Sequence, residues 1–235
     1  QGSSNTDGSI NTTYTSANTT SGFSIVKYTG TGANATVGHG LGVAPKMIIF
    51  KNTNTVTDWD VYHGSLANTE RIHLNTTGAK NTAAHAFNST SPTTSVFSVG
   101  TADNTNKSSS PMIAYCFADV QGYSKFGSYT GNGNADGVFQ YLGFKPAWVM
   151  IKKTSGTGSW WMFDNKRLGY NPSNSRLYAN DTASGATATV IDFLSNGFKF
   201  RSDDGELNAS GGTYVYIAFA SSPLVSSNNV PANAR

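Results

Sequence analysis

Hydrophobic residues along this chain occur in short runs that are separated by stretches of Gly, Pro, Asn and Thr. The runs 47–50 and 148–151 are rich in Ile, Val, Met and aromatic side chains, and a proline lies shortly before each of them. Short apolar runs with these boundaries are typical of buried β-strands. No stretch keeps a convincing 3.6-residue apolar period, and 192–195 would form one helical turn at most. The pattern therefore predicts an all-β chain of many short strands, of the β-sandwich or jelly-roll-like kind.

The hydrophobic pattern occurs twice along the chain. The matching segments are 22–32 with 122–133, 42–51 with 143–152, 59–62 with 160–163, 71–75 with 176–180, and 113–118 with 215–220. Each copy spans roughly a hundred residues, which is the size of a small domain. We therefore expect two tandem, homologous β-sandwich domains, at 22–120 and at 121–235, the second with a C-terminal tail.

Residues 1–21 are almost entirely Ser, Thr, Asn and Gly. A segment with so little apolar surface to bury does not fold alone. We expect an N-terminal arm or linker that orders only against a neighbour, with 13–15 able to add one edge strand.

The composition narrows the classes of function. Charged residues make up 12% of the chain, about half the usual share of about 25%, and Asn, Thr, Ser and Gly take their place. Such a surface is common in proteins that work outside cells. The net charge of +3 is spread along the chain, whereas a nucleic-acid groove needs clustered basic residues. No segment approaches the ~20 apolar residues of a membrane helix, so we expect neither nucleic-acid binding nor membrane insertion.

Candidate chemical groups are few, and the repeat argues against most of them. Cys116 is the only cysteine, which excludes an intramolecular disulfide, and it lies in an apolar run where a buried thiol is expected. None of the four histidines recurs as His in the second copy, which argues against a metal site; they are His39, His63, His73 and His85. The acidic stretch 203–206 would form a solvated hairpin more readily than a calcium loop.

The glycine-rich segments 30–32 and 38–42 lack the helix that a phosphate loop requires, so they are expected to be turns. Ser and Thr are so frequent that a Ser/His/Asp set would arise by chance. We therefore assign no catalytic residue, no metal and no cofactor, and we expect a protein that is not an enzyme.

The aromatic residues are more informative than the charged ones. Four of them recur between the copies and are expected to anchor the two cores: Trp59, Phe117, Trp160 and Phe219. Alternation along a strand then places the next residues on the opposite face. This opposite face is expected to form a contact surface for the other copy, another subunit or a sugar, with Asp60 and Tyr62 in the first copy and Trp161 and Phe163 in the second. The alternative is a shifted register in the second copy, with Trp161 and Phe163 in its core.

Several long segments resemble a known group of proteins. They are 22–26, 37–49, 115–133, 146–152, 193–199 and the closing 230–235. Together they resemble an uncharacterised domain at the C-terminal ends of tail-fibre-like structural proteins of marine bacteriophages, cyanophages among them. The resemblance covers about residues 5–235.

The resemblance implies a non-enzymatic component of the virion surface, a fibre or appendage domain that contacts a host glycan or receptor. Its partners would be other virion or fibre subunits, with a homo-oligomer expected. The alternative is a purely structural extracellular or virion module, such as a capsid decoration, a fibre shaft or a filament subunit. A third possibility is a glycan depolymerase, which would need two carboxylates roughly 5–9.5 Å apart in a cleft.

Overall fold

The computed structural model describes residues 2–167 and 171–220. The chain is all-β, with 44% of residues in strands and 2% in helix. Every pairing between named strands is antiparallel. Within the described residues the single helix is α1 (Asp103–Asn106), so none is long and apolar enough to cross a membrane. The predicted all-β class is confirmed.

The chain folds as two compact units. Unit 1 holds the described residues up to Asn75 together with Lys80–Asp119, and unit 2 holds Thr76–Ala79 together with the described residues from Val120 onward. The division after Asp119 lies beside the boundary predicted between 120 and 121. The four residues of unit 2 that interrupt unit 1 were not predicted.

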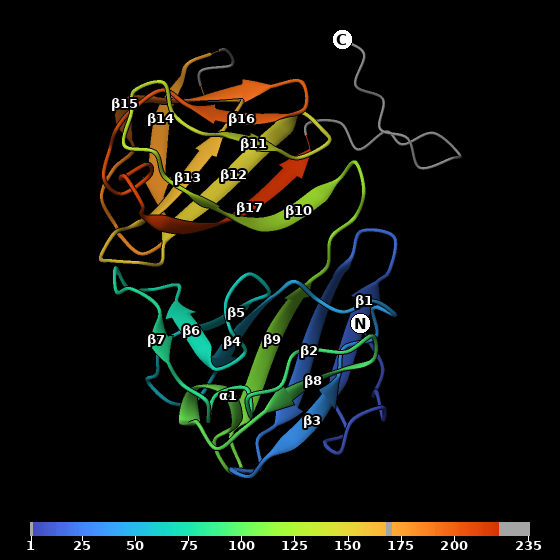
Figure 1. The fold of residues 1–235 in the computed structure, drawn as a ribbon. Coiled ribbons are helices and arrows are strands. Elements are labelled where there is room, and N and C mark those ends of the chain that lie inside the picture. Colours follow the sequence, from blue (N-terminus) through green and yellow to red (C-terminus); the bar gives the residue numbers. More distant parts are fainter. Residues whose placement is uncertain (1, 168–170, 221–235) are drawn as a thin grey trace. The chain divides into compact units, whose positions relative to one another are not determined.

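Unit 1 contains a seven-stranded sheet in the order β1-β2-β9-β4-β5-β6-β7 and a two-stranded sheet of β3 and β8 (Figure 1). The strands are β1 (Tyr14–Asn18), β2 (Phe23–Thr29), β3 (Ala35–Gly38), β4 (Met47–Asn52), β5 (Asp60–His63), β6 (Glu70–His73), β7 (Asn81–Thr82), β8 (Val96–Val99) and β9 (Pro111–Phe117). Tyr28 and Phe50 of the large sheet pack against Phe97 of β8 in one apolar core.

Unit 2 contains an eight-stranded sheet in the order β10-β17-β12-β13-β14-β15-β16-β11 (Figure 1). The strands are β10 (Ser124–Thr130), β11 (Phe139–Tyr141), β12 (Pro146–Lys153), β13 (Trp160–Asp164), β14 (Ser173–Tyr178), β15 (Ala186–Leu194), β16 (Gly197–Phe200) and β17 (Thr213–Ala220). Its core includes Tyr129, Phe198 and Tyr214. Residues 192–194, in the stretch considered for a helical turn, instead end β15, where Ile191 and Phe193 belong to the core of unit 2.

The strand registers of the two units can be compared residue by residue. Met47 lies opposite Phe117, and Trp148 lies opposite Phe219. The anchors place Phe50 of β4 and Ile151 of β12 at equivalent positions. Phe50 is paired with Asp60, and Ile151 is paired with Trp161. We call residues that these registers place alike corresponding residues. Trp59 and Trp160 therefore correspond, as the repeat predicted, and so do Phe117 and Phe219.

The predicted faces of β5 and β13 are wrong. Directly paired residues on neighbouring strands share a face, and the partners of Asp60 and Trp161 are the core residues Phe50 and Ile151. All four residues expected on a contact surface are consequently buried and face the interiors of their units: Asp60, Tyr62, Trp161 and Phe163. Trp161 and Phe163 lie in the core of unit 2, as the alternative predicted. No register shift separates the two units, however, because Asp60 and Tyr62 also face inward in unit 1.

The expected core anchors lie on the opposite face of the sheets. Trp59 is half-buried, just before β5 begins, whereas Trp160 is fully buried. Phe117 and Phe219 are half-buried at the ends of their strands, where they contact the rings of Phe23 and Phe126. They lie outside the two core clusters, because β9 and β17 direct Ala114 and Ala218 inward instead.

The N-terminal segment is part of unit 1 rather than a linker. β1 is the edge strand of the large sheet, pairing Tyr14 with Lys27, which extends the predicted 13–15 strand. Ile10 forms an isolated bridge with Val37 and is buried in the core. The few apolar residues of the segment are enough because the backbone completes an existing sheet.

Candidate functional site

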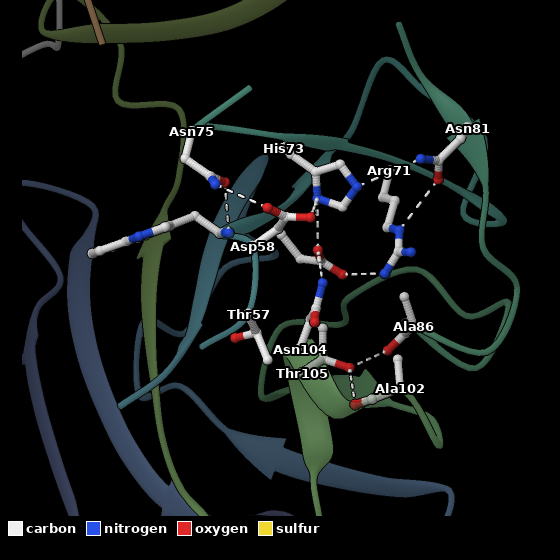
Figure 2. A network of polar contacts seen from close by, with 12 residues as sticks. Thr57, Asp58, Arg71, His73, Asn75, Asn81, Ala86, Ala102, Asn104 and Thr105 are labelled. Carbon is white, nitrogen blue, oxygen red and sulfur yellow. Dashed lines mark hydrogen bonds and ion pairs between the residues drawn. The ribbon is translucent and has the colours of Figure 1, made fainter. Parts of the chain in front are cut away.

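A buried carboxylate, Asp60, lies within a polar network of unit 1 that includes Arg71, His73 and Asn104, which are labelled in Figure 2. Its side chain is 0% exposed. Oδ2 accepts a hydrogen bond from Arg71 Nη1 at 2.7 Å, and Oδ1 accepts one from Asn104 Nδ2 at 2.8 Å. His73 Nδ1 lies 2.9 Å from the same Oδ1. Residues of β5, β6 and α1 thus meet at a single carboxylate.

The surroundings of Asp60 keep its carboxylate charged. Burial by itself raises the pKa, but hydrogen bonds from His73 and Asn104 and the charge of Arg71 outweigh burial and leave the pKa below its ordinary value. A buried carboxylate with this set of donors is satisfied rather than reactive.

An Asp–His pair is also part of hydrolase triads, so the group beside the second imidazole nitrogen bears on its role. His73 Nε2 lies 3.5 Å from Nδ2 of Asn81, and an amide is not a nucleophile. Asn81 also accepts a hydrogen bond from Arg71 Nε at 3.2 Å. The arrangement therefore suits a structural tie that joins β5, β6, β7 and α1.

The corresponding place in unit 2 holds a different set of side chains. The guanidinium of Arg176 lies 4.5 Å from the Trp161 ring centroid and 5.4 Å from that of Tyr178. Trp161 is 3% exposed, and its Nε1 donates to Glu206 Oε2 at 2.8 Å. A cation–π stack in unit 2 thus replaces the ion pairs of unit 1.

The other candidates from the sequence do not assemble into a site. Among the described residues, no group of three or more His, Cys, Asp or Glu side chains is placed to hold a metal ion. His39 is buried, with Nδ1 accepting from Leu41 N at 3.2 Å, and burial lowers its pKa. Cys116 is buried as predicted, and burial raises its pKa to about 12, so the thiol stays protonated.

The acidic stretch 203–206 leads into a turn rather than a strand hairpin, and the Glu206 carboxylate accepts hydrogen bonds within unit 2. Glu206 Oε2 accepts from Ser159 N as well as from the Trp161 indole. Gly205 O accepts from Lys153 Nζ at 2.8 Å. The turn therefore braces the core of unit 2.

An open hollow lies on the outer face of the unit 1 sheet. Its volume is about 600 Å³. Trp59, Ile113 and Tyr115 supply the apolar lining, and Lys51 Nζ lies 5.8 Å from the Trp59 ring centroid. The remaining lining residues belong to the 52–56 loop, in which Val56 is fully exposed. We refer to this feature as the outer hollow.

A second exposed aromatic surface lies on β11 of unit 2. Phe139 is 41% exposed and Tyr141 is 59% exposed. They are two residues apart on an edge strand, so both side chains point to the same side. Lys125 Nζ lies 5.4 Å from the Tyr141 ring centroid and donates to its carbonyl at 3.1 Å. We refer to Phe139, Tyr141 and Lys125 as the β11 platform.

Sequence reasoning missed the residues that make these features. Arg71 and Arg176 had been visible as a recurring cation in the matched segments 71–75 and 176–180, within a chain poor in charge. Phe139 and Tyr141 lie in none of the matched segments, so the repeat gave no signal for them.

The fold and these surfaces define an all-β protein with buried polar networks beside its apolar cores and with aromatic side chains exposed on its surface. The chain belongs to the family described as a domain of unknown function (DUF7483), whose model matches residues 1–223. No curated protein and no solved structure matches the chain.

Proposed function

We propose that this protein is a non-enzymatic structural component of a virion fibre or appendage that contacts glycans on a host surface. In this proposal it consists of two tandem, homologous, jelly-roll-like β-sandwich domains and acts as part of a homo-oligomer outside the cell. The sequence resemblance to tail-fibre-like proteins, the uncharged polar composition and the exposed β11 platform support the proposal.

Matching buried contacts support the duplication. Asn106 Oδ1 accepts from Thr31 N, and Asn208 Oδ1 accepts from Asn132 N. In each unit the asparagine Nδ2 also donates to two backbone carbonyls on different loops. The same side chain bracing the same pair of loops is expected from a common ancestor of the two units.

The proposed glycan contact rests on the exposed rings of the β11 platform. The C–H face of a pyranose ring packs on exposed aromatic rings, and the hydroxyl groups around it need polar neighbours. Phe139 and Tyr141 present two rings side by side, and Lys199 lies opposite Phe139 in the pairing of β16. A single contact of this size is weak, so repeated copies in an appendage would supply the avidity.

A glycan array tests this function with the whole protein displayed in many copies. Binding of wild-type protein and at least a tenfold loss for Tyr141→Ala are expected, since the platform loses a ring but the fold keeps its core. Tyr14→Ala is the matched control, because Tyr14 is a 43% exposed tyrosine on an edge strand of unit 1. No binding by wild-type protein, or equal loss in both variants, would refute the platform. A parallel measurement of released reducing ends separates adhesion from depolymerase activity.

A purely structural module is the second candidate, and the outer hollow favours it. An apolar, half-buried face on a sheet is typical of a surface that another protein covers.

A further inference from the structure

The turn Thr76–Ala79 follows β6 of unit 1 but packs as part of unit 2. Its Thr77 carbonyl accepts a hydrogen bond from Gly158 N at 2.9 Å and from Lys152 Nζ at 3.3 Å. Both donors lie beside the outer face of the β12–β13 pair. Unit 2 thus has a turn-binding position on this face, and the chain itself fills it.

The residues around that position are buried. Lys152 and Trp160 are both fully buried, and Val215 and Ile217 of β17 are 1% and 4% exposed. The corresponding residues of unit 1 are Lys51, Trp59, Ile113 and Tyr115, which line the outer hollow and are only partly buried. The outer hollow is therefore the same position, and no turn from the described part of the chain is bound in it.

The turn also has a counterpart. Asn75 Oδ1 accepts from Trp59 N, and Asn180 Oδ1 accepts from Trp160 N, so these asparagines correspond. The residues that follow Asn180 therefore correspond to Thr76–Ala79. They are 181–184, and all of them are exposed.

We propose that the outer hollow binds the 181–184 turn of a second copy of this chain. Thr182 corresponds to Thr77, so its carbonyl would accept from Lys51 Nζ and from the backbone N–H of Thr57, the residue that corresponds to Gly158. Asp181 replaces Thr76 in this turn and complements the charge of Lys51.

The interface is heterologous, because one copy contributes the hollow and the other contributes the turn. In a bound pair one copy keeps a free turn and the other keeps a free hollow, so further copies can add at both ends and the contact generates a row of subunits rather than a closed dimer. This inference suits a fibre but does not depend on the glycan contact, which uses a different surface.

Two variants that each block one side test the interface. Trp59→Asp blocks the hollow and places a carboxylate against Asp181, whereas Ala183→Arg blocks the turn. Both positions lie outside the two apolar cores, and circular dichroism with thermal unfolding verifies that the variants are folded. The measurement is sedimentation velocity over a concentration series of the full chain.

Wild-type protein is expected to form a concentration-dependent ladder of oligomers, and each variant alone is expected to be monomeric. An equimolar mixture of the two variants should form a dimer that grows no further, because only one compatible hollow and turn remain. Tyr14→Ala should assemble like wild-type protein.

Several results would overturn the proposal. These are a wild-type chain that stays monomeric at its highest soluble concentration, variants that assemble normally, or a mixture that stays monomeric while wild-type protein assembles. Glycan binding that is lost in Trp59→Asp, with a monomeric wild type, would instead make the hollow a ligand site. Faster hydrogen exchange at β4 and β9 after deletion of 221–235 would assign the hollow to the chain's own C-terminal segment. Because Tyr141→Ala tests the platform separately, assembly and glycan binding can fail independently.

Discussion

Arg71 in unit 1 and Arg176 in unit 2 occupy corresponding positions but have different partners. Arg71 pairs with the buried carboxylate of Asp60 at 2.7 Å, whereas Arg176 lies over the indole of Trp161. Both units use the same cation, which faces a full negative charge in unit 1 and the electron-rich face of a ring in unit 2. Both partners favour a guanidinium, which is planar, permanently charged and able to stack.

The neighbours of the two arginines differ as a set. Asp60 accepts from the amide of Asn104, and Trp161 donates to the carboxylate of Glu206. Asn104 and Glu206 each lie two residues before the matched Asn106 and Asn208, so the donor and the acceptor have exchanged places. In each unit the side chains of this set have partners within it. We therefore expect that exchanging the whole set costs less stability than exchanging one member alone.

The largest expected loss of stability comes from removing or exchanging a single member of the polar set around Arg71. Asp60→Ala leaves Arg71 without its buried carboxylate, and we expect unit 1 to lose about 3–5 kcal/mol of stability. Asp60→Trp should be at least as damaging, but adding His73→Tyr and Asn104→Glu should recover part of the loss, because these three changes rebuild the unit 2 set. Hydrogen exchange of the full chain in urea measures each unit separately. Strictly additive losses would refute the idea of a coupled set.

The sequence predicted the all-β class correctly but assigned the wrong face at β5 and β13. Two tryptophans lie next to each other in unit 2, so alternation alone cannot say whether Trp160 or Trp161 faces the core. Trp59 points to the wrong face as well, because it precedes β5 and packs against Lys51 on the outer face. The apolar partners in β4, Ile48 and Phe50, would have given the correct face, but only once the pairing register was known.

The buried network was invisible in the sequence for a related reason. Asp60 looks like a surface residue because its partners Arg71, His73 and Asn104 lie 11 to 44 positions away along the chain. An isolated buried carboxylate would be prohibitively costly, so sequence reasoning places Asp outside unless its partners are known. The outer hollow is equally a product of the tertiary structure, since β4, β9 and the 52–56 loop build it jointly.

The outer faces of the two units give a second test of the comparison, with a smaller effect. Burial lowers the pKa of Lys152 to about 8, below the ordinary value of about 10.4. Between these pH values the unfolded chain binds more protons at this group than the folded chain, so stability should rise with pH by up to about 3 kcal/mol. Lys152→Met should remove this rise, which hydrogen exchange in unit 2 at pH 8 and pH 10 can measure. An unchanged rise in the variant would assign it to other groups.

A change of pH should also distinguish the units on the acidic side. The lowered pKa of Asp60 gives a stabilisation that is fully present above the unfolded value of about 3.9 and is lost as pH falls through the folded value. The loss should be smaller than that of Asp60→Ala, because protonation removes the charge but leaves an oxygen to accept hydrogen bonds. Urea unfolding of wild-type protein and Asp60→Asn from pH 5 to pH 2 measures it. Equal acid sensitivity of unit 1 in both proteins would contradict the prediction.

The smallest effect, and the most direct test of the opening comparison, concerns the arginines themselves. Arg176→Lys keeps a cation over the rings of Trp161 and Tyr178, so unit 2 should lose only about 0.5–1 kcal/mol. Arg71→Lys should cost unit 1 more, because one ammonium cannot reproduce both the Nη1 bond to Asp60 and the Nε bond to Asn81. Urea unfolding followed by hydrogen exchange in β6 and β14 gives both numbers from full-length proteins. If Arg176→Lys proves the costlier change, stacking of the planar guanidinium matters more than its hydrogen bonds, and the two arginines are held in place by shape rather than by charge.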